Sequence, residues 1–223
     1  KSIELFSNVI NYKKSEFLEP SLVFLARISY DNQDFDLSNS HYTILDTISS
    51  NNELKRESVV RLMYGYEGVD LFQSSRYAER VLNIDKLDDI LIARSKMIIA
   101  RSDFEYGNYA RSLALCNDVI NLTKNKDGTE AMYLKSYFLY LEDSFTRAEE
   151  IIFEMADQYS SDHWIAKGFL LLSDIYVKLD NDYQAKAILE SVIEYHDGVE
   201  IVNVARKKWE DIVKLELSDN EMI

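Results

Sequence analysis

The stretch Leu172-Ser173-Asp174-Ile175-Tyr176, followed by Ala185, Leu189 and Val192, decides the fold of this chain. An apolar and a small residue precede the tyrosine by four and three positions. The later alanine precedes two apolar residues by four and seven positions. This spacing is typical of two consecutive helices whose small residues let them cross at close range. We therefore predict a pair of helices joined by the turn Asp180-Asn181-Asp182.

The small residue in the second helix of this pair recurs along the whole chain. Successive occurrences are separated by 36, 36, 38, 36 and 37 residues, and each is serine or alanine. A period of this length, in which each unit is a helix pair, is typical of a solenoid, because one pair cannot bury its apolar face alone. The recurring positions are Ser2, Ser38, Ser74, Ser112, Ala148 and Ala185.

The repeats predict an all-α solenoid (α-α solenoid) of about five helix pairs, with an N-terminal half repeat and a C-terminal capping helix. Residues 2–11 match only the second helix of a pair, so we expect this chain to be a fragment of a longer protein that continues upstream. The capping helix covers about residues 199–217, with one apolar and one charged face, as a solenoid end requires. We predict a single solenoid domain over residues 1–217 and a frayed tail over residues 218–223.

Composition favours a foldable helical chain and argues against nucleic acid as a partner. Of the 223 residues, 47% are hydrophobic and 29% are charged, and one proline with six glycines leaves few forced breaks in helices. The formal net charge of −14 repels phosphate backbones and anionic membrane surfaces. No apolar run approaches the roughly 18 residues of a membrane span, so we expect no direct membrane insertion.

Residue types that could carry catalysis or hold a metal are dispersed along the chain. The three histidines, His41, His163 and His196, are far apart, and none has a partner at helical spacing for a metal ion. Cys116 is the single cysteine, which excludes an internal disulfide, and it falls on a core position of the repeat. Asp88-Asp89 lies at a predicted helix start, where the helix dipole favours negative charge. We therefore predict no enzymatic activity, no metal site and no cofactor.

The segment Phe169-x-x-Leu172-Ser173-x-x-Tyr176, with Ala185-x-x-x-Leu189, resembles the helix-pair consensus of the tetratricopeptide repeat (TPR) superfamily. Gly107-Asn108-Tyr109 and Asp143-Ser144-Phe145 resemble its turn and the aromatic start of its second helix. The resemblance covers about residues 2–195. The chain departs from the family in two respects: no proline follows a second helix at the usual place, and the periods exceed the usual length of about 34 residues.

This resemblance implies a right-handed superhelix in which the first helices of the pairs line a concave face. It also implies a non-enzymatic scaffold that binds a peptide or protein segment through that face. Slightly long repeats are similar to those of long bacterial TPR proteins, many of them in the cell envelope, so the resemblance favours the periplasmic side of a bacterial envelope. It specifies neither the partner protein nor the oligomeric state.

On this register the inner face of the first helices carries an aromatic ladder and two arginines. Four successive repeats have an aromatic residue at one inner position, and Val177 interrupts the series. Such a groove suits a peptide segment with apolar anchors and one acidic group. The candidate partner-binding residues are Arg27, Tyr30, Tyr66, Met97, Arg101, Phe104, Tyr133, Tyr137 and Tyr140.

Two other interpretations of the ladder stay open. Aromatic residues at helical spacing commonly pack against the neighbouring repeat, and they then have a purely structural role. Alternatively, Tyr133, Tyr137 and Tyr140 lie on or near one helix face and could stack on a glycan or small molecule. An open solenoid groove offers no enclosed pocket, which counts against this second alternative.

Overall fold

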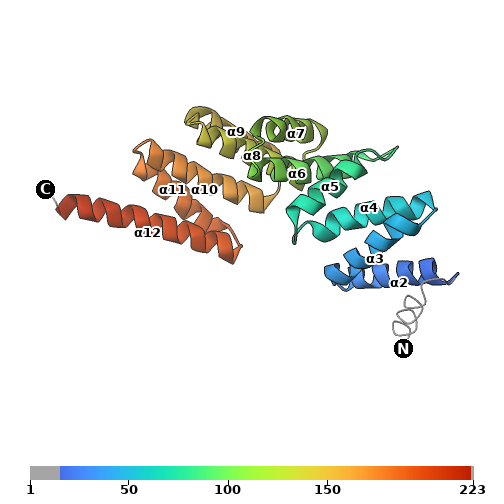
Figure 1. Ribbon diagram of the computed structural model, residues 1–223. Helices are drawn as coiled ribbons and strands as arrows, with labels where there is room; N and C mark the ends of the chain where they lie inside the picture. Colours follow the sequence, from blue (N-terminus) through green and yellow to red (C-terminus); the bar gives the residue numbers. More distant parts are fainter. Residues whose placement is uncertain (1–15, 222–223) are drawn as a thin grey trace. The chain divides into compact units, whose positions relative to one another are not determined.

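A computed structural model describes residues 16–221, and within this range all of the regular secondary structure is helical (Figure 1). The predicted half repeat over residues 2–11 lies outside the described residues. The helices are α2 (Leu18–Asp31), α3 (Phe35–Ile48), α4 (Asn52–Tyr66), α5 (Leu71–Val81), α6 (Asp89–Glu105), α7 (Tyr109–Leu122), α8 (Lys126–Leu141), α9 (Phe145–Gln158), α10 (Asp162–Lys178), α11 (Asp182–Tyr195) and α12 (Val199–Glu221).

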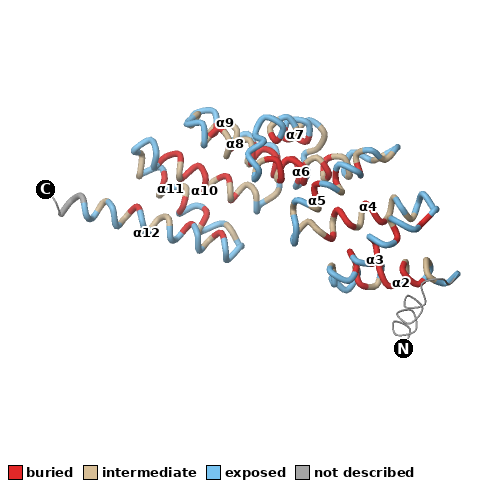
Figure 2. Tube along the Cα trace, viewed as in Figure 1, coloured by how far each residue is buried: buried red, intermediate tan, exposed pale blue. Residues whose placement is uncertain are grey.

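Helices α2–α11 form five consecutive pairs, and α12 follows the last pair. This arrangement confirms the predicted α solenoid. Buried residues recur along the helices, whereas most of the turns between them are exposed (Figure 2). The last helix extends to Glu221, beyond the predicted end of the capping helix at Leu217.

The contacts divide the chain into two compact units. The first unit comprises residues 1–115 and the second unit comprises residues 116–223, so the division falls within α7. The prediction of a single domain over residues 1–217 stays a prediction.

Four of the five turns within the helix pairs share one conformation. In each, three residues separate the helices, and the middle one is left-handed, with φ between 53° and 79°. The residue that closes the turn donates its amide to the carbonyl five positions earlier, as Asn108 does to Asp103 at 2.7 Å, which makes a Schellman motif. The accepting residues share one position of the predicted register, and they are Ser29, Asp103, Leu139 and Tyr176.

The repeat formed by α4 and α5 departs from this pattern. Gly65 of α4 occupies the repeat position that carries Tyr176 in α10. The buried Asn39 of α3 lies against this glycine, and a Cβ added there would be 2.1 Å from Asn39 Oδ1. The turn that follows is also one residue longer than the other four. An aromatic side chain at Gly65 is therefore excluded by the neighbouring helix.

The small residue of each second helix is buried, which confirms the predicted close crossings. In the first unit this residue is serine, and its hydroxyl donates to a backbone carbonyl of the first helix in the same pair. The bonds are Ser38 to Ala26 at 3.1 Å, Ser74 to Met63 at 2.8 Å and Ser112 to Ala100 at 2.8 Å.

In the second unit the distribution of the hydroxyl groups is reversed. The second helices carry the buried Ala148 and Ala185. The residues twelve positions earlier are Ser136 and Ser173, and each donates its hydroxyl to a carbonyl within its own helix, at 2.9 Å and 2.7 Å. These crossings are therefore closed by apolar packing, without a hydrogen bond from the small residue of the second helix.

Ion pairs join successive repeats of the first unit. Two of the pairs connect one first helix to the next first helix, and in one of these the carboxylate is the C-terminal cap of its helix. The other two pairs connect one second helix to the next second helix. The pairs are Arg27–Glu57, Asp46–Arg80, Glu67–Arg101 and Glu79–Arg111.

Among the carboxylates of these four pairs, Glu67 binds two arginines. Its Oε1 accepts from Arg101 Nη2 at 2.5 Å and also from Arg94 Nη2, and all three side chains are less than a third exposed. Burial by itself would raise the pKa of Glu67, but the hydrogen bond and charge of Arg101, together with those of Arg94, bring the pKa below its usual value. The folded state therefore favours the ionised carboxylate.

Replacing a crossing residue tests the predicted register. Ala185→Glu places a charged side chain where two helices cross, and we expect it to lower the free energy of unfolding by at least about 3 kcal/mol. Ala187→Glu, on the exposed side of the same helix, should change it by less than about 0.5 kcal/mol. Urea denaturation followed by circular dichroism measures both values. Equal effects of the two substitutions would contradict the register.

The arginine pair on Glu67 predicts a dependence of stability on pH. Because the pKa of Glu67 is lower in the folded state, its contribution is fully present above the unfolded value of about 4.3 and is lost as pH falls through the folded value. Glu67→Gln should lower stability by about 1–3 kcal/mol at pH 7, and its difference from the parent protein should shrink in acid. The exposed Glu105→Gln serves as control, and a difference that is constant down to pH 3 would refute the assignment.

Candidate partner-binding site

All nine candidate residues lie on first helices of the pairs, and they are divided between the two units. Six lie in the first unit, on α2, α4 and α6, and three lie in the second unit, on α8.

Met97 is a core residue, and its prediction as a partner-binding residue is wrong. Its side chain is fully buried, so it cannot contact a partner. The residues that follow it, Ile98, Ile99 and Ala100, are also buried. Four consecutive buried positions show that α6 is enclosed on every side here, whereas the register assumed one exposed inner face.

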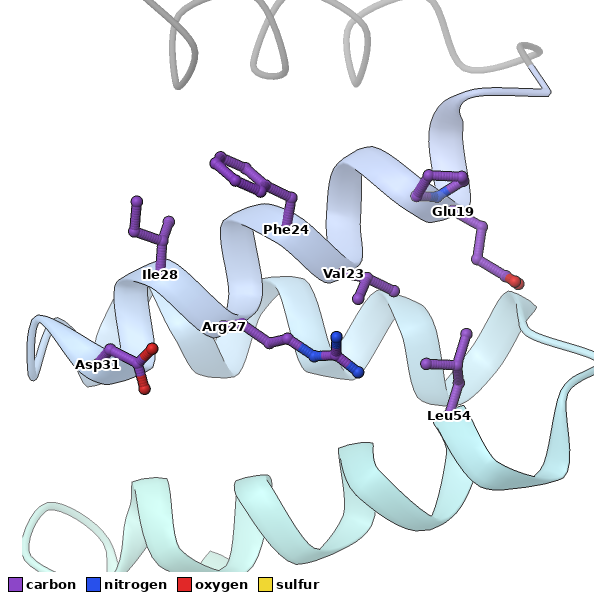
Figure 3. Close-up of a pocket in the computed structure, with 8 residues that line it drawn as sticks. Glu19, Val23, Phe24, Arg27, Ile28, Asp31 and Leu54 are labelled. Atoms are coloured by element: carbon purple, nitrogen blue, oxygen red, sulfur yellow. The ribbon is translucent and has the colours of Figure 1, made fainter.

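Arg27 lies beside a cavity of about 590 Å³ that is lined by α2 and by Leu54 of α4. Figure 3 shows Val23, Arg27 and Leu54 extending into the space between these two helices. The guanidinium of Arg27 donates to both carboxylate oxygens of Glu57, at 2.5 Å and 2.7 Å, and the Tyr42 hydroxyl donates to the same carboxylate at 3.0 Å.

These hydrogen bonds pair the positive charge of Arg27 with the negative charge of Glu57. The bond from Arg27 holds the pKa of Glu57 below its usual range, against the opposing effect of burial. Arg101 is likewise paired, with Glu67. An acidic group of a partner would have to compete with an internal carboxylate at each of the two predicted arginines.

The ladder aromatics of the first unit pack against the second helix of their own repeat. The ring centroids of Tyr30 and Phe35 are 5.5 Å apart, and those of Phe104 and Tyr109 are 5.2 Å apart, both edge to face. Tyr66 stacks on Tyr77 at 5.8 Å. These contacts support the structural interpretation of the ladder in this unit, because each ring fills the angle between two helices.

The second unit has a groove between α8, α10 and α12, with a cavity of about 320 Å³. Tyr133 and Tyr137 of α8 form one wall, and the buried Leu170, Leu171 and Ile201 form the apolar floor. The remaining residues at this groove are His163, Lys167, Asp174, Glu200, Val204 and Lys208.

A series of aromatic rings runs along α8 beside this groove. Trp164 of α10 packs on Tyr133 with centroids 5.3 Å apart. Tyr133, Tyr137 and Tyr140 then follow at 6.3 Å and 6.2 Å, with interplanar angles of 9° and 19°. The series ends on Phe145 of α9, at 5.9 Å. The predicted tyrosines of α8 are therefore the candidates that the structure does bring together.

The polar groups of the groove differ in whether they are already paired. Asp174 of α10 forms an ion pair with Lys208 of α12. Lys167 instead lies over the Trp164 ring, with Nζ 4.5 Å from its centroid. Within the described residues neither Lys167 nor Glu200 forms an ion pair, so these two side chains present one positive and one negative charge to a ligand.

Two titratable rings of the groove are neutral near pH 7. Burial, reinforced by Tyr137 and Asp174, raises the pKa of Tyr133 to about 12, so its phenol is a hydrogen-bond donor over the physiological range. Partial burial and the nearby lysines Lys167 and Lys126 lower the pKa of His163. The groove can therefore bind through apolar contact and hydrogen bonds with little change in protonation.

The register missed Trp164, Lys167 and the whole contribution of α12. The first two lie in the opening turns of α10, before the positions that repeat. The last helix was interpreted only as a cap. One signal in the sequence could have revealed its role: Lys208 follows Asp174 by 34 residues, the same interval that separates the paired Glu67 and Arg101. The helix thus occupies the place of a sixth first helix.

Two further properties bear on the chemistry of the described residues. Between residues 16 and 221, no three His, Cys, Asp or Glu side chains come together as a group that could hold a metal ion. In the same part of the chain, no helix combines the length and the apolar character that crossing a membrane requires.

No protein-family model matches this sequence, and a search of curated proteins finds no match. Solved structures do share its fold. A crystal structure of the MamA protein aligns with a TM-score of 0.58 at 13% sequence identity, covering 90% of this chain and 96% of that chain. A second crystal structure of MamA gives a TM-score of 0.55 at 14% identity, covering 85% and 97%. At this identity the likeness concerns the fold, and it supports a helical repeat fold of the TPR type.

Proposed function

We propose that this chain is a non-enzymatic interaction scaffold, and that its α8–α10–α12 groove binds a peptide or protein segment. The observation that carries the proposal is the groove itself, in which an apolar floor and a tyrosine wall lie between two charged side chains without ion-pair partners. Apolar pockets with a few polar groups at the edge are typical of ligand sites. Large apolar side chains of a partner segment are the groups that such a floor would bury.

The size of the groove favours a side-chain anchor over a complete large ligand. Its volume of about 320 Å³ is at the lower end of the range of about 300–1,000 Å³ for sites that enclose small molecules. Lys167 and Glu200 lie on different helices and carry opposite charges, so they suit the polar groups that flank an anchor on an extended segment. Neutral tyrosine hydroxyls can donate to the carbonyl groups of such a segment.

The glycan alternative has less support from the same geometry. A sugar stacks on an open aromatic face, whereas Tyr133, Tyr137 and Tyr140 lie near-parallel and pack on one another. Trp164 also has Lys167 over its ring. The series of rings is therefore largely occupied with internal contacts.

The test is selection of short random peptides displayed on phage against the folded chain, followed by anisotropy measurements on the selected peptides. Val204→Asp introduces a charge at a side chain that is 41% exposed and lines the groove, so the fold should be retained. We expect it to weaken binding at least about tenfold, because an apolar contact is replaced by a desolvated charge. Tyr137→Ala should have an effect in the same direction.

The matched control is Phe153→Ala, which removes an aromatic side chain from α9, outside the groove. Phe153 is 46% exposed, similar to Val204. Its affinity for the selected peptides should equal that of the parent chain. Peptides that bind all variants equally would remove the groove from consideration. A glycan array with hits that Tyr137→Ala abolishes, together with no selected peptide, would favour the alternative function.

A further inference from the structure

We infer a second docking surface in the first unit, which binds a basic segment of a protein partner. It consists of the exposed apolar residues Val69, Phe72, Tyr106 and Tyr109, here called the turn patch. They lie in and directly after the α4–α5 and α6–α7 turns. This surface shares no residue with the α8–α10–α12 groove and does not depend on the function proposed for it.

The turn patch combines large exposed areas with direct contact between neighbouring repeats. The exposed fractions are 65% for Val69, 50% for Phe72, 64% for Tyr106 and 41% for Tyr109. The rings of Phe72 and Tyr106 meet edge to face with centroids 6.0 Å apart, so the two turns form one surface. Contiguous exposed aromatic surface rimmed by polar residues is typical of protein interfaces.

The backbone conformation of the turns does not require the aromatic side chains of Phe72 and Tyr106. Tyr106 caps the C-terminus of α6 with φ −88° and ψ 6°, and Asn32 holds the equivalent position after α2 with φ −82° and ψ 1°. Phe72 is the second residue of α5, and the second residues of α3 and α9 are Asp36 and Thr146. Polar residues therefore adopt the same backbone conformation at equivalent positions. The conformation of the backbone does not explain why these two turns carry aromatic residues.

The charge around the turn patch indicates the chemistry of its occupant. Residues 62–75 and 102–110 contain four carboxylates, and an arginine lies directly outside each end of the two stretches, at Arg61, Arg76, Arg101 and Arg111. Glu67 and Asp103 are paired with arginines of the same unit. Asp70 and Glu105 form no ion pair within the described residues, and the exposed Arg76 forms none there either, so the charge left beside the aromatic rings is net negative.

A segment with arginine or lysine side chains around an apolar residue fits this combination. The carboxylates attract its charges, the rings accept its cations over their faces, and the apolar residue covers the exposed aromatic area. The net charge of −14 of the whole chain also steers a cationic segment towards the surface. The same charge repels nucleic acids and anionic lipids, so a protein is the partner class that the surface favours.

The probe is a fluorescein-labelled peptide of alternating arginine and leucine, titrated with the chain at low salt and followed by anisotropy. Phe72→Thr combined with Tyr106→Asn gives the two turns the residues that equivalent turns already carry, so folding should be preserved. We expect this variant, and separately Glu105→Lys, to weaken binding at least about tenfold. Higher salt should weaken the interaction as well.

The controls separate a site from general attraction to an acidic protein. Tyr183→Thr removes an aromatic side chain that is 80% exposed in the second unit, and Glu150→Lys reverses an exposed charge on α9. Both should leave the affinity within about twofold. A peptide with serine in place of leucine should bind much more weakly than the probe. Equal loss in patch and control variants, equal binding of the serine peptide, or no binding of the probe would each overturn the inference.

Discussion

The close crossing of the two helices in each repeat requires a small residue at one position, and the remaining structure is arranged around that crossing. In the first unit Ser38, Ser74 and Ser112 do more than fit, because their hydroxyls bond to carbonyls of the facing helix. Ala148 and Ala185 close the second-unit crossings by packing alone. In four of the five pairs the crossing is accompanied by a left-handed turn and the hydrogen bond that closes it.

Charges on the first helices are used differently in the two units. In the first unit Arg27 and Arg101 of the inner face bind Glu57 of the next first helix and Glu67 at the end of the preceding one, so these ion pairs connect the repeats and leave little charge for a partner on that face. In the second unit Asp174 and Lys208 continue this arrangement, but Lys167 and Glu200 do not take part in it. A surface that has used its charges internally is a weak recognition surface. This difference explains why the groove of the second unit is the better candidate site.

The sequence predicted the helix pairs, their register and the buried small residues, because each is encoded by a residue type that recurs at a fixed interval. It did not predict which carboxylate pairs with Arg27, since Glu57 is 30 residues away and the choice depends on the rotation of two helices about their axes. Met97 was misplaced for a related reason. Periodicity identifies the inner side of a helix, but not whether a neighbouring helix covers that side. Trp164 was missed because it lies before the repeating positions of its helix, and the contribution of α12 to the groove was missed because that helix was predicted only as a cap.

Residues that the repeat does not need are the most informative about binding in this fold. A crossing serine, a turn residue or a paired arginine is explained by the helix pair itself, and its presence says nothing about a partner. Lys167 and Glu200 line the groove and, within the described residues, take no part in the ion pairs that join the repeats. The helix pair does not explain the aromatic residues Phe72 and Tyr106, because other turns of the same chain carry polar residues at the equivalent positions. In a repeat protein each repeat can be compared with the other repeats of the same chain. A residue that departs from the shared pattern indicates a position where selection acts on something other than folding.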